Sequence, residues 1–287
     1  MKELKGRVAV VTGGASGIGQ GMARALAAEG MKIVVADIEA EARDRAVEDL
    51  MEHGAEAIGV ECDVAQKASL EAVREAALSA FGAVHVVCNN AGVAGGQPGP
   101  IWAAPQDDWD WVLGVNLLGV VHGIQTFVPL LIEQGEGGHI VNTASLAGLI
   151  EGTGIYGVSK QACVGLSETL WRDLEATKSG VSASVLCPGW VNTRIMESER
   201  NRPEAPRPEV EIPAEALAMR NLVKGFLEKG LDPLDVGRRV AQAIQDKTFY
   251  ILTHPSWNNM IRNRMENILA SRDPVPVPPE GGDFPLE

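Results

Sequence analysis

The chain has 287 residues, 45% of them hydrophobic, so it can bury a large core as one domain with a C-terminal extension. Its formal net charge of −13 disfavours binding to nucleic acids and to anionic membrane surfaces. No leader peptide precedes the first apolar segment, and no continuous apolar run reaches about 18 residues. We therefore expect a soluble cytoplasmic protein whose partners include neither nucleic acid nor a membrane.

Short β-branched runs alternate with helical patterns along the chain. This alternation is typical of βαβ units and predicts a doubly wound, parallel α/β sheet of about seven strands with helices on both faces. The strands are expected near 7–11, 32–36, 56–61, 84–88, 138–143, 182–187 and 248–252. The helices are expected near 17–29, 39–52, 66–80, 106–134, 154–177 and 232–246.

A glycine-rich turn connects the first predicted strand to the first predicted helix. Gly13, Gly17 and Gly19 let the backbone approach a pyrophosphate, and the free N–H groups at the start of the helix attract its negative charge. A strand, a glycine-rich turn and a helix in this order predict a Rossmann-like dinucleotide site. The G-x-x-x-G-x-G spacing differs from the better known G-x-G-x-x-G.

Asp37 ends the second predicted strand, where a dinucleotide site places the acid that accepts hydrogen bonds from the adenosine ribose. A 2′-phosphate at this place would meet a negative charge, and the neighbouring Ser16, Ile38 and Glu39 carry no compensating positive charge. The sequence therefore favours NAD over NADP as the cofactor. A role of Asp37 in capping the following helix is compatible with this interpretation.

The four cysteines are spaced too widely for a C-x-x-C motif, and no cluster of cysteine and histidine suggests a metal site. We interpret them as buried, small apolar residues in a reducing compartment. They are Cys62, Cys88, Cys163 and Cys187. We expect no metal centre.

Tyr156 and Lys160 are four residues apart and therefore share one face of a predicted helix. An ammonium beside a phenol favours the phenolate, which makes the two side chains an acid–base pair. Taken alone, this spacing suits equally a packed ring beside a solvated lysine. The surrounding motifs decide between the two interpretations.

Together these motifs resemble the short-chain dehydrogenase/reductase family over roughly residues 5–195. The matching segments are 12–19, 62–64, 89–92, Asn116, Ser145, 156–160 and 188–193. The resemblance implies a Rossmann-like dehydrogenase domain, here residues 1–272, that transfers a hydride between NAD and a secondary alcohol or ketone.

By this resemblance, Tyr156 is the general acid in reduction and the general base in oxidation, and Lys160 helps it to ionise and holds the nicotinamide ribose. Ser145 orients the substrate and stabilises the developing alkoxide. Asn116 holds a water that links Lys160 to solvent. Considered without the resemblance, Asn116 also suits a packing or helix-bend role, and Ser145 a turn or helix-cap role.

The resemblance also assigns the cofactor site, from the phosphate turn through the adenosine ribose and the adenine to the nicotinamide. The predicted residues are Gly13, Ser16, Gly17, Ile18, Gly19, Asp37, Ile38, Asp63, Val64, Asn90, Ala91, Gly92, Tyr156, Lys160, Pro188, Gly189, Val191 and Thr193. For Asn89 next to them, pinning of neighbouring strands is at least as good an interpretation.

An apolar substrate pocket is expected from Ser145, Leu146, Ile150 and Trp190. Such a lining suits a hydrophobic, cyclic or aromatic secondary alcohol or ketone. The loop between Ser145 and Tyr156 is shorter than in many members of the family, so their substrate shapes do not transfer. Glu151 in this loop either recognises a polar substrate group or faces solvent.

Two segments interrupt the regular alternation. The stretch 194–230, rich in proline and charge, is expected to be a substrate lid that includes a helix from Ala214 to Lys229. A short helix near 256–270 is expected to dock on the body or on another subunit. The last residues, 273–287, are rich in proline and glycine and are expected to be extended or disordered.

The resemblance also predicts a homotetramer, or a dimer if the tail blocks the second interface. The apolar residues that would contact either a second subunit or the chain's own core are Val112, Val115, Val120, Leu166 and Leu170. Two other functions stay open: a family member with non-redox chemistry, such as an epimerase or dehydratase, and a non-catalytic NAD-sensing protein. The intact glycine motif and the intact Tyr156–Lys160 pair favour the dehydrogenase.

Overall fold

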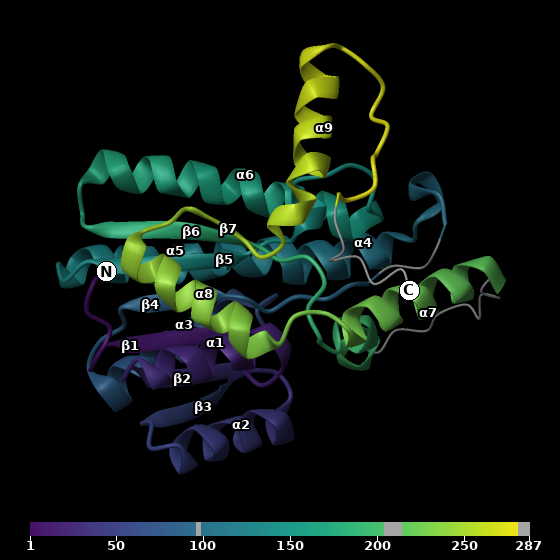
Figure 1. Cartoon of the computed structure of the whole chain (residues 1–287). Coiled ribbons are helices and arrows are strands. Elements are labelled where there is room, and N and C mark those ends of the chain that lie inside the picture. Colours follow the sequence, from purple (N-terminus) through teal and green to yellow (C-terminus); the bar gives the residue numbers. More distant parts are fainter. Residues whose placement is uncertain (96–98, 204–213, 281–287) are drawn as a thin grey trace.

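Seven parallel strands within the described residues form one sheet in the order β3-β2-β1-β4-β5-β6-β7 (Figure 1). The computed structural model describes residues 1–95, 99–203 and 214–280. The strands are β1 (Val8–Thr12), β2 (Lys32–Asp37), β3 (Ala57–Glu61), β4 (Val86–Asn89), β5 (Gly138–Thr143), β6 (Val181–Cys187) and β7 (Tyr250–Leu252). The strand order reverses between β1 and β4, which is where sheets of this kind bind ligands. The predicted doubly wound α/β fold is confirmed.

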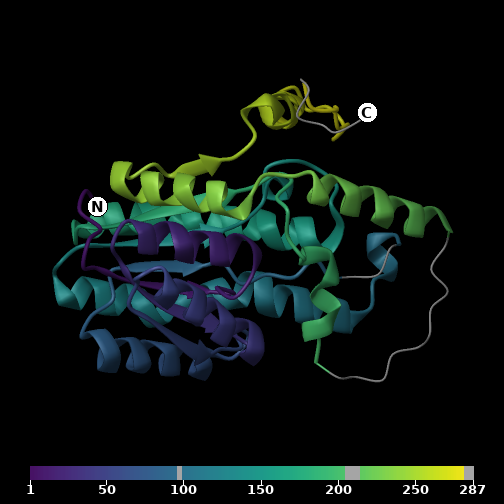
Figure 2. The ribbon, with the colours of Figure 1, turned by 60° about the horizontal axis from the view of Figure 1, so that its bottom comes forward.

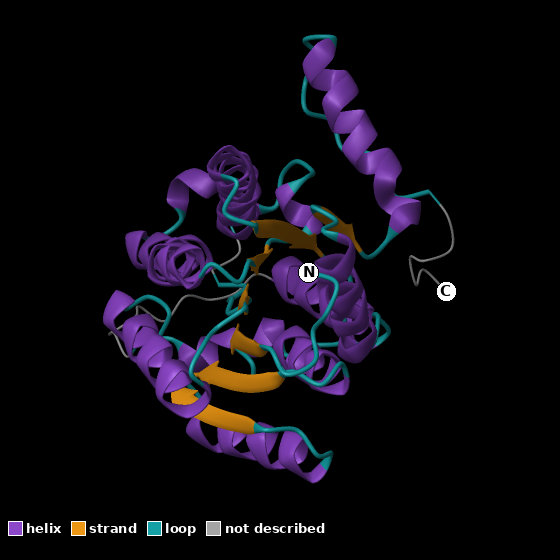
Figure 3. Ribbon diagram, turned by 90° about the vertical axis from the view of Figure 1, so that its left-hand side faces the viewer, coloured by secondary structure: helices purple, strands orange, loops and turns teal. Residues whose placement is uncertain are grey.

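Helices cover both faces of the sheet (Figure 3). One face carries α1 (Gly17–Ala28), α2 (Ala40–Glu52) and α8 (Pro233–Asp246), and the other carries α3 (Lys67–Phe81), α5 (Gly119–Gln134) and α6 (Gly154–Thr177). Side chains alternate along β1, so that Ala9 and Val11 pack in the first layer and Val8 and Val10 in the second. Because both faces are covered, β1 is an uninterrupted apolar run.

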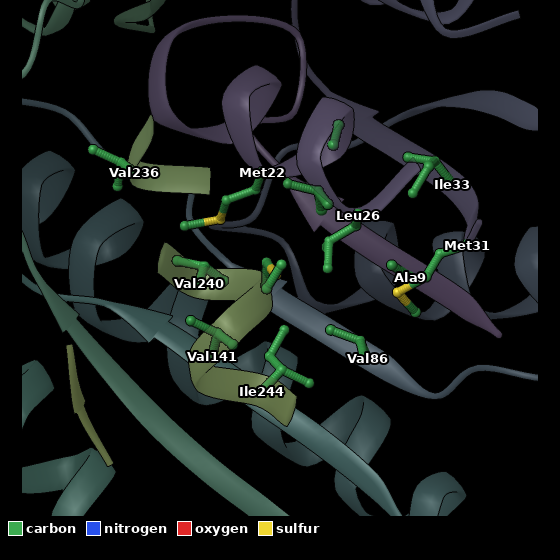
Figure 4. Packing of buried hydrophobic residues seen from close by; sticks show 14 of the residues in the cluster. Ala9, Met22, Leu26, Met31, Ile33, Val86, Val141, Val236, Val240 and Ile244 are labelled. Carbon is green, nitrogen blue, oxygen red and sulfur yellow. The ribbon is translucent and has the colours of Figure 1, made fainter. Parts of the chain in front are cut away.

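The close contact between α1 and α8 holds the N-terminal half of the sheet together. Met22 and Leu26 of α1 share one buried cluster with Val240 and Ile244 of α8 (Figure 4). A Cβ atom on Gly21 would overlap the carbonyl group of Pro233, so the two helices can approach this closely only at a glycine. The packing thereby fixes α1, whose first residues belong to the glycine-rich turn.

The helix expected over 106–134 is divided by a π turn, η2 (Gly114–Leu118), which separates α4 (Gln106–Leu113) from α5. Among the described residues, this stretch is long and apolar enough to cross a membrane by length and composition, with a mean hydropathy of 1.7. It contains polar interruptions such as Asn116, and Phe127 packs it against the sheet. Because core helices pass the same test, this is weak evidence for a membrane span.

Most residues considered for a subunit contact belong to the chain's own core. Val112, Val120 and Leu170 are buried, whereas Val115 and Leu166 are partly buried. Apolar side chains with an exposed surface in the same region are Leu118, Val158 and Trp171.

The connection from β6 to α8 contains a 3-10 helix, η4 (Ile195–Asn201), and α7 (Ala214–Glu228) (Figure 2). Residues 204–213 of the expected lid lie outside the described residues. Beyond β7, η5 (Pro255–Trp257) leads into α9 (Asn258–Leu269), which projects away from the sheet (Figure 1).

Residues 273–280 return beside α9 (Figure 3), whereas 281–287 of the expected tail lie outside the described residues.

Candidate active site

A cavity of about 1250 Å³ lies at the carboxyl ends of the strands, around the switch point between β1 and β4. The structure brings nearly all of the predicted site residues to this one cavity. Only Gly19 and Asn116 do not line it. The glycine-rich turn, Asp37 and the Tyr156–Lys160 pair therefore border one continuous space.

The glycine-rich turn depends on backbone conformations that other residues rarely adopt. Gly13 and Gly17 have φ angles of +61° and +51°. A Cβ atom on Gly17 would lie 3.0 Å from the Cγ2 of Thr193, which closes the turn from the opposite side. Gly19 does not line the cavity, because it packs against the carbonyl group of Gly13 and leaves no room for a side chain. Its function is to shape the turn.

Asp37 ends β2 with only 7% of its surface exposed. Its Oδ2 accepts a hydrogen bond from the N–H of Ala15 at 3.0 Å, and its Oδ1 accepts one from the N–H of Glu39 at 3.0 Å. Burial raises the pKa of the Asp37 carboxyl, and the backbone hydrogen bonds oppose this effect. Asp37 thus borders the cavity and also holds the turn before α2.

The neighbours of Asp37 in the sequence carry no positive charge, as stated above, but a cation from a distant segment lies beside Glu39. Arg200 of η4 crosses to Glu39, with 2.6 Å between its Nη2 and the Oε1 of Glu39. The hydrogen bond from Arg200 lowers the pKa of the Glu39 carboxyl. The two residues are far apart in the sequence, so the local sequence around Asp37 contains no sign of this cation.

Tyr156 and Lys160 lie one turn apart on α6, as expected from their spacing. Lys160 is 3% exposed, and its Nζ donates a hydrogen bond to the carbonyl oxygen of Thr143 at 2.9 Å. The same Nζ lies 5.7 Å from the centre of the Tyr156 ring. The end of β5 thus fixes the ammonium, and the ammonium lies beside the phenol ring.

Ser145 follows β5 and precedes a short 3-10 turn, η3 (Leu146–Gly148). Its Oγ accepts a hydrogen bond from the N–H of Ala147 at 3.1 Å and lies 3.5 Å from the carbonyl oxygen of Pro188. The cap role considered for Ser145 is therefore present. Ser145 also lines the cavity, as Tyr156 does, and the cap hydrogen bond holds its hydroxyl in place.

Asn116 lies in the π turn with no exposed surface. Its Nδ2 donates to the carbonyl oxygen of Val93 at 3.0 Å and to the Oγ of Ser159 at 3.1 Å, and its Oδ1 accepts from the N–H of Val93 at 2.9 Å. The amide thus joins the loop after β4 to α6. Its Oδ1 and the Nζ of Lys160 both lie next to Gly92. π turns occur often at functional sites.

A second polar network holds the loop after β4. The Oγ1 of Thr12 accepts a hydrogen bond from the N–H of Asn90 at 2.9 Å, and the Oγ1 of Thr143 donates to the Oδ1 of Asn90 at 3.2 Å. Sequence analysis did not single out Thr12, although it ends β1 directly before the glycines. The neighbouring Asn89 donates to the Oδ1 of Asn142 at 2.9 Å, which confirms the interpretation that it pins adjacent strands.

The other end of the cavity has an aromatic wall that the sequence analysis identified only in part. The ring centre of Trp190 lies 5.7 Å from that of Phe226 in α7 and 6.0 Å from that of Trp257 in η5. Trp257 and Met260 line the cavity but were not predicted, because they lie far from the family motifs. Glu151 does not line it, and its Oε1 lies 3.5 Å from the Nδ2 of Asn263 in α9.

Residues 195–203, which we call the strap, contribute to the lining of the same cavity. The Oγ of Ser198 accepts a hydrogen bond from the N–H of Ala94 at 3.1 Å. Arg202 lies 2.6 Å from a carboxylate oxygen of Asp108 and 4.6 Å from the centre of the Trp111 ring. Together with the Arg200–Glu39 pair, these contacts attach the strap to both sides of the cavity.

Comparisons with known proteins agree with this geometry. A family model described as short chain dehydrogenase matches residues 7–204. A "CLA biosynthesis dehydrogenase/reductase" from Lactiplantibacillus plantarum is 35% identical over 280 residues, which cover 96% of this chain and 97% of that protein. A 1-deoxy-11-beta-hydroxypentalenate dehydrogenase from Streptomyces avermitilis is 40% identical over 192 residues, which cover 66% of this chain and 70% of that protein.

Among solved structures, a short chain dehydrogenase/reductase from Burkholderia phymatum in complex with NAD superimposes with a TM-score of 0.92. It is 44% identical in sequence, and the match covers 97% of this chain and 99% of that one. The chain belongs to the short chain dehydrogenase family and is therefore an oxidoreductase by family.

Proposed function

We propose that the chain is an NAD-dependent dehydrogenase that interconverts a hydrophobic secondary alcohol and its ketone, with Tyr156 as the acid–base residue. One observation carries the proposal. The acid–base pair Tyr156–Lys160, the hydroxyl of Ser145 and the buried acid Asp37 border a single cavity. A binding module has no need of an acid–base tyrosine, whereas a dehydrogenase needs all of these groups.

The residues of the cavity fit a dinucleotide. Gly13 and Gly17 bring the backbone to the start of α1, where free N–H groups suit a pyrophosphate. Asp37 lies at the end of β2, where the adenosine ribose would donate to it. The charge of Arg200 is paired with Glu39, so Asp37 still disfavours a 2′-phosphate. The NAD complex of the Burkholderia phymatum relative supports NAD.

The chain's own residues provide the proton chemistry of the proposed reaction. In oxidation, the phenolate of Tyr156 accepts the proton of the substrate hydroxyl, while Ser145 holds the substrate oxygen by a hydrogen bond. NAD, when bound, accepts the hydride from the carbinol carbon. Lys160, fixed by Thr143, stabilises the phenolate. In reduction, Tyr156 returns the proton to the carbonyl oxygen.

We assign Asn116 a positioning role in this site. Its amide is occupied by Val93 and Ser159, so it orders the wall next to Lys160. The water relay expected at Asn116 stays a prediction.

The substrate class follows from the wall of the cavity. Leu146, Ile150 and the Trp190–Trp257 pair are apolar and bulky. Such a wall favours a hydrophobic substrate, because burial of apolar surface stabilises the complex. We propose that the strap, which is the described first part of the expected lid 194–230, covers the cavity, since it contacts both Glu39 and Asp108.

We also propose a cytoplasmic homo-oligomer, a tetramer or else a dimer. The buried, free cysteines fit a reducing compartment. Leu118, Val158 and Trp171 are between 43% and 47% exposed and would be covered by a second subunit. Light scattering at micromolar concentration tests this, and a monomer would contradict it.

The test of the proposed function is absorbance at the reduced-nicotinamide band, with NAD and NADP side by side, on a panel of cyclic, aromatic and aliphatic secondary alcohols. We expect turnover with NAD and little with NADP. Product formation without a net change in absorbance would instead indicate epimerase- or dehydratase-like chemistry. A protein partner whose affinity depends on NADH, without turnover of any alcohol, would indicate an NAD sensor.

A further inference from the structure

The C-terminal segment after α9 is held in place by three asparagine side chains. Asn259, Asn263 and Asn267 are spaced by four residues and therefore share one face of α9. Asn263 and Asn267 donate from Nδ2 to the carbonyl oxygen of Val275, at 2.8 Å and 3.3 Å. Asn259 donates to the carbonyl oxygen of Pro278 at 2.7 Å.

The spacing of the asparagines matches the repeat of the segment that they bind. Prolines at 274, 276, 278 and 279 favour a polyproline II conformation, which has no regular internal hydrogen bonds to occupy the carbonyl groups of Val275 and Pro278. Val275 and Pro278 are one polyproline turn apart, a rise of ~9 Å. From Asn259 to the midpoint of the other two asparagines, α9 rises by about the same distance. The helix thus offers amide donors where the segment presents free carbonyls.

We call the three asparagines, together with the segment 273–280 that they bind, the clamp. Two further contacts fix its start and its end. Ser271 adopts a left-handed φ of +52° and turns the chain back, with the N–H of Arg272 bonded to the carbonyl oxygen of Asn267 at 2.8 Å. At the far end, the Oδ1 of Asn259 accepts a hydrogen bond from the N–H of Glu280 at 3.2 Å. Asn259 therefore holds the backbone on both sides of Pro279.

The clamped segment ends at the cavity. Pro278 and Pro279 line it together with Trp257 of η5 and Met260 of α9. Because the ring of Trp257 packs on that of Trp190, this wall is at the substrate end. The Nδ2 of Asn263 also lies 3.5 Å from Glu151, in the loop between Ser145 and Tyr156.

We propose that Asn259, Asn263 and Asn267 are positioning residues that hold Pro278 and Pro279 as a wall of the substrate cavity, so that the C-terminal segment selects alcohols by size. The size selection rests on the proposed dehydrogenase function, whereas the clamp itself does not. When the segment is released from the asparagines, the cavity widens at this end. Bulky alcohols then gain contacts with the wall, and small alcohols lose them.

The decisive pair of full-length variants is Asn259→Asp and Asn258→Asp. Asn259→Asp keeps the acceptor for Glu280 but places a carboxylate against the carbonyl oxygen of Pro278. Asn258→Asp introduces the same charge one residue earlier, at an exposed position. Both lie in the first turn of α9, so the effect of the added charge on the helix dipole is matched.

A fluorophore attached to the cysteine of a Pro276→Cys variant reports whether the segment is held by the clamp. This measurement does not require enzymatic activity. Selective labelling is possible because the four native cysteines are buried, and burial raises the pKa of the Cys62, Cys88 and Cys187 thiols to about 12. We expect the anisotropy of the label to fall in Asn259→Asp and to stay unchanged in Asn258→Asp. Equal anisotropy in both variants would overturn the clamp.

The wall is tested by the ratio of kcat/KM for a bulky alcohol to that for a small one. We expect Asn259→Asp to raise this ratio roughly tenfold, through KM, while the Kd for NADH and the ratio in Asn258→Asp stay unchanged. A fall in anisotropy with an unchanged ratio would overturn the wall.

If the wild type oxidises no alcohol, the proposed function fails. The wall is then tested by titration with 1-anilinonaphthalene-8-sulfonate in the presence of NADH. Tighter binding to Asn259→Asp than to Asn258→Asp would support the wall, and equal binding would contradict it.

Discussion

The ammonium of Lys160 lies 5.7 Å from the centre of the Tyr156 ring, and the carbonyl oxygen of Thr143 holds it there at 2.9 Å. Lys160 is almost fully buried, so little water screens its charge from the phenol. An ammonium that cannot move away is a permanent electrostatic partner for a phenolate. This relationship is the physical basis of the acid–base role that we propose for Tyr156.

We expect Lys160→Met to lower kcat. Methionine keeps an unbranched side chain of similar length but removes the cation, so Tyr156 loses the positive charge beside its ring. Steady-state kinetics with NAD measures kcat, and titration with NADH measures cofactor binding. Weaker binding of NADH with an unchanged kcat would mean that Lys160 contributes only to cofactor binding.

Asp37 should make NAD binding sensitive to acid. Burial raises the pKa of its carboxyl, so it takes up a proton at a higher pH than an ordinary aspartate. In the proposed site the ribose hydroxyls would donate to the carboxylate form, so protonation and NAD would compete, and we expect the affinity for the cofactor to fall as the pH drops through the raised pKa of Asp37. Fluorescence titration with NADH from pH 7 to pH 4 measures this.

The matched variant for this titration is Asp37→Asn. We expect it to bind NADH roughly tenfold more weakly at pH 7, because it loses a charge-assisted hydrogen bond, and to show a flatter dependence on pH. If the Asp37→Asn variant kept the acid sensitivity of the wild type, the titration would belong to another group.

The sequence predicted those parts of the site that are local in the chain. The glycine-rich turn, Asp37 at the end of β2 and the Tyr156–Lys160 spacing each depend on a few neighbouring residues and a standard backbone geometry. The alternation of strands and helices likewise follows from the burial of both faces of the sheet. Such patterns can be found without knowledge of the tertiary structure.

The parts that were missed depend on contacts between distant segments. Arg200 reaches Glu39 from η4, in the connection between β6 and α8, and Trp257 and Met260 reach the cavity from η5 and α9. The π turn at Asn116 interrupts an apolar pattern that continues unbroken in sequence. Neither hydrophobic periodicity nor turn chemistry encodes these encounters, since each depends on how separate elements pack.

Arg202 should be the main anchor of the strap. Its side chain is 7% exposed and that of Asp108 is 1% exposed, so Arg202→Met removes the cation of a buried ion pair. We expect this variant to lose more than about 1 kcal/mol of unfolding free energy, measured by urea denaturation, and to raise KM.

Arg238→Met is the control for this variant, because the Arg238–Asp235 pair is largely exposed. It should cost less than about 1 kcal/mol. Equal losses in the two variants would show that Arg202 does not anchor the strap.

His139 should make the fold itself sensitive to acid. It is fully buried in β5, and burial lowers its pKa to about 3, against 6.5 for the free side chain. Because the pKa of His139 is lower in the folded protein, the unfolded chain binds a proton at this histidine at a higher pH than the folded protein does. The stability contributed by neutral His139 is therefore complete above pH 6.5 and is lost as the pH falls from there towards 3.

Between pH 7 and pH 5, this linkage removes about 2 kcal/mol of unfolding free energy. We expect the loss of unfolding free energy between these two pH values to be smaller by that amount in His139→Gln than in the wild type. Urea denaturation at each pH measures it. The same slope in the wild type and in His139→Gln would mean that other groups carry the acid sensitivity.

The most direct test of the account is the turnover of Tyr156→Phe with NAD and the best alcohol of the panel. The chain has one other tyrosine, Tyr250, whose hydroxyl donates to Glu168 at 2.6 Å outside the cavity, so Tyr250→Phe is the matched control. We predict that Tyr156→Phe lowers kcat by roughly 10²–10⁴-fold with NADH still bound normally, and that Tyr250→Phe keeps wild-type turnover. Full turnover by Tyr156→Phe would contradict the acid–base role on which the proposed function rests.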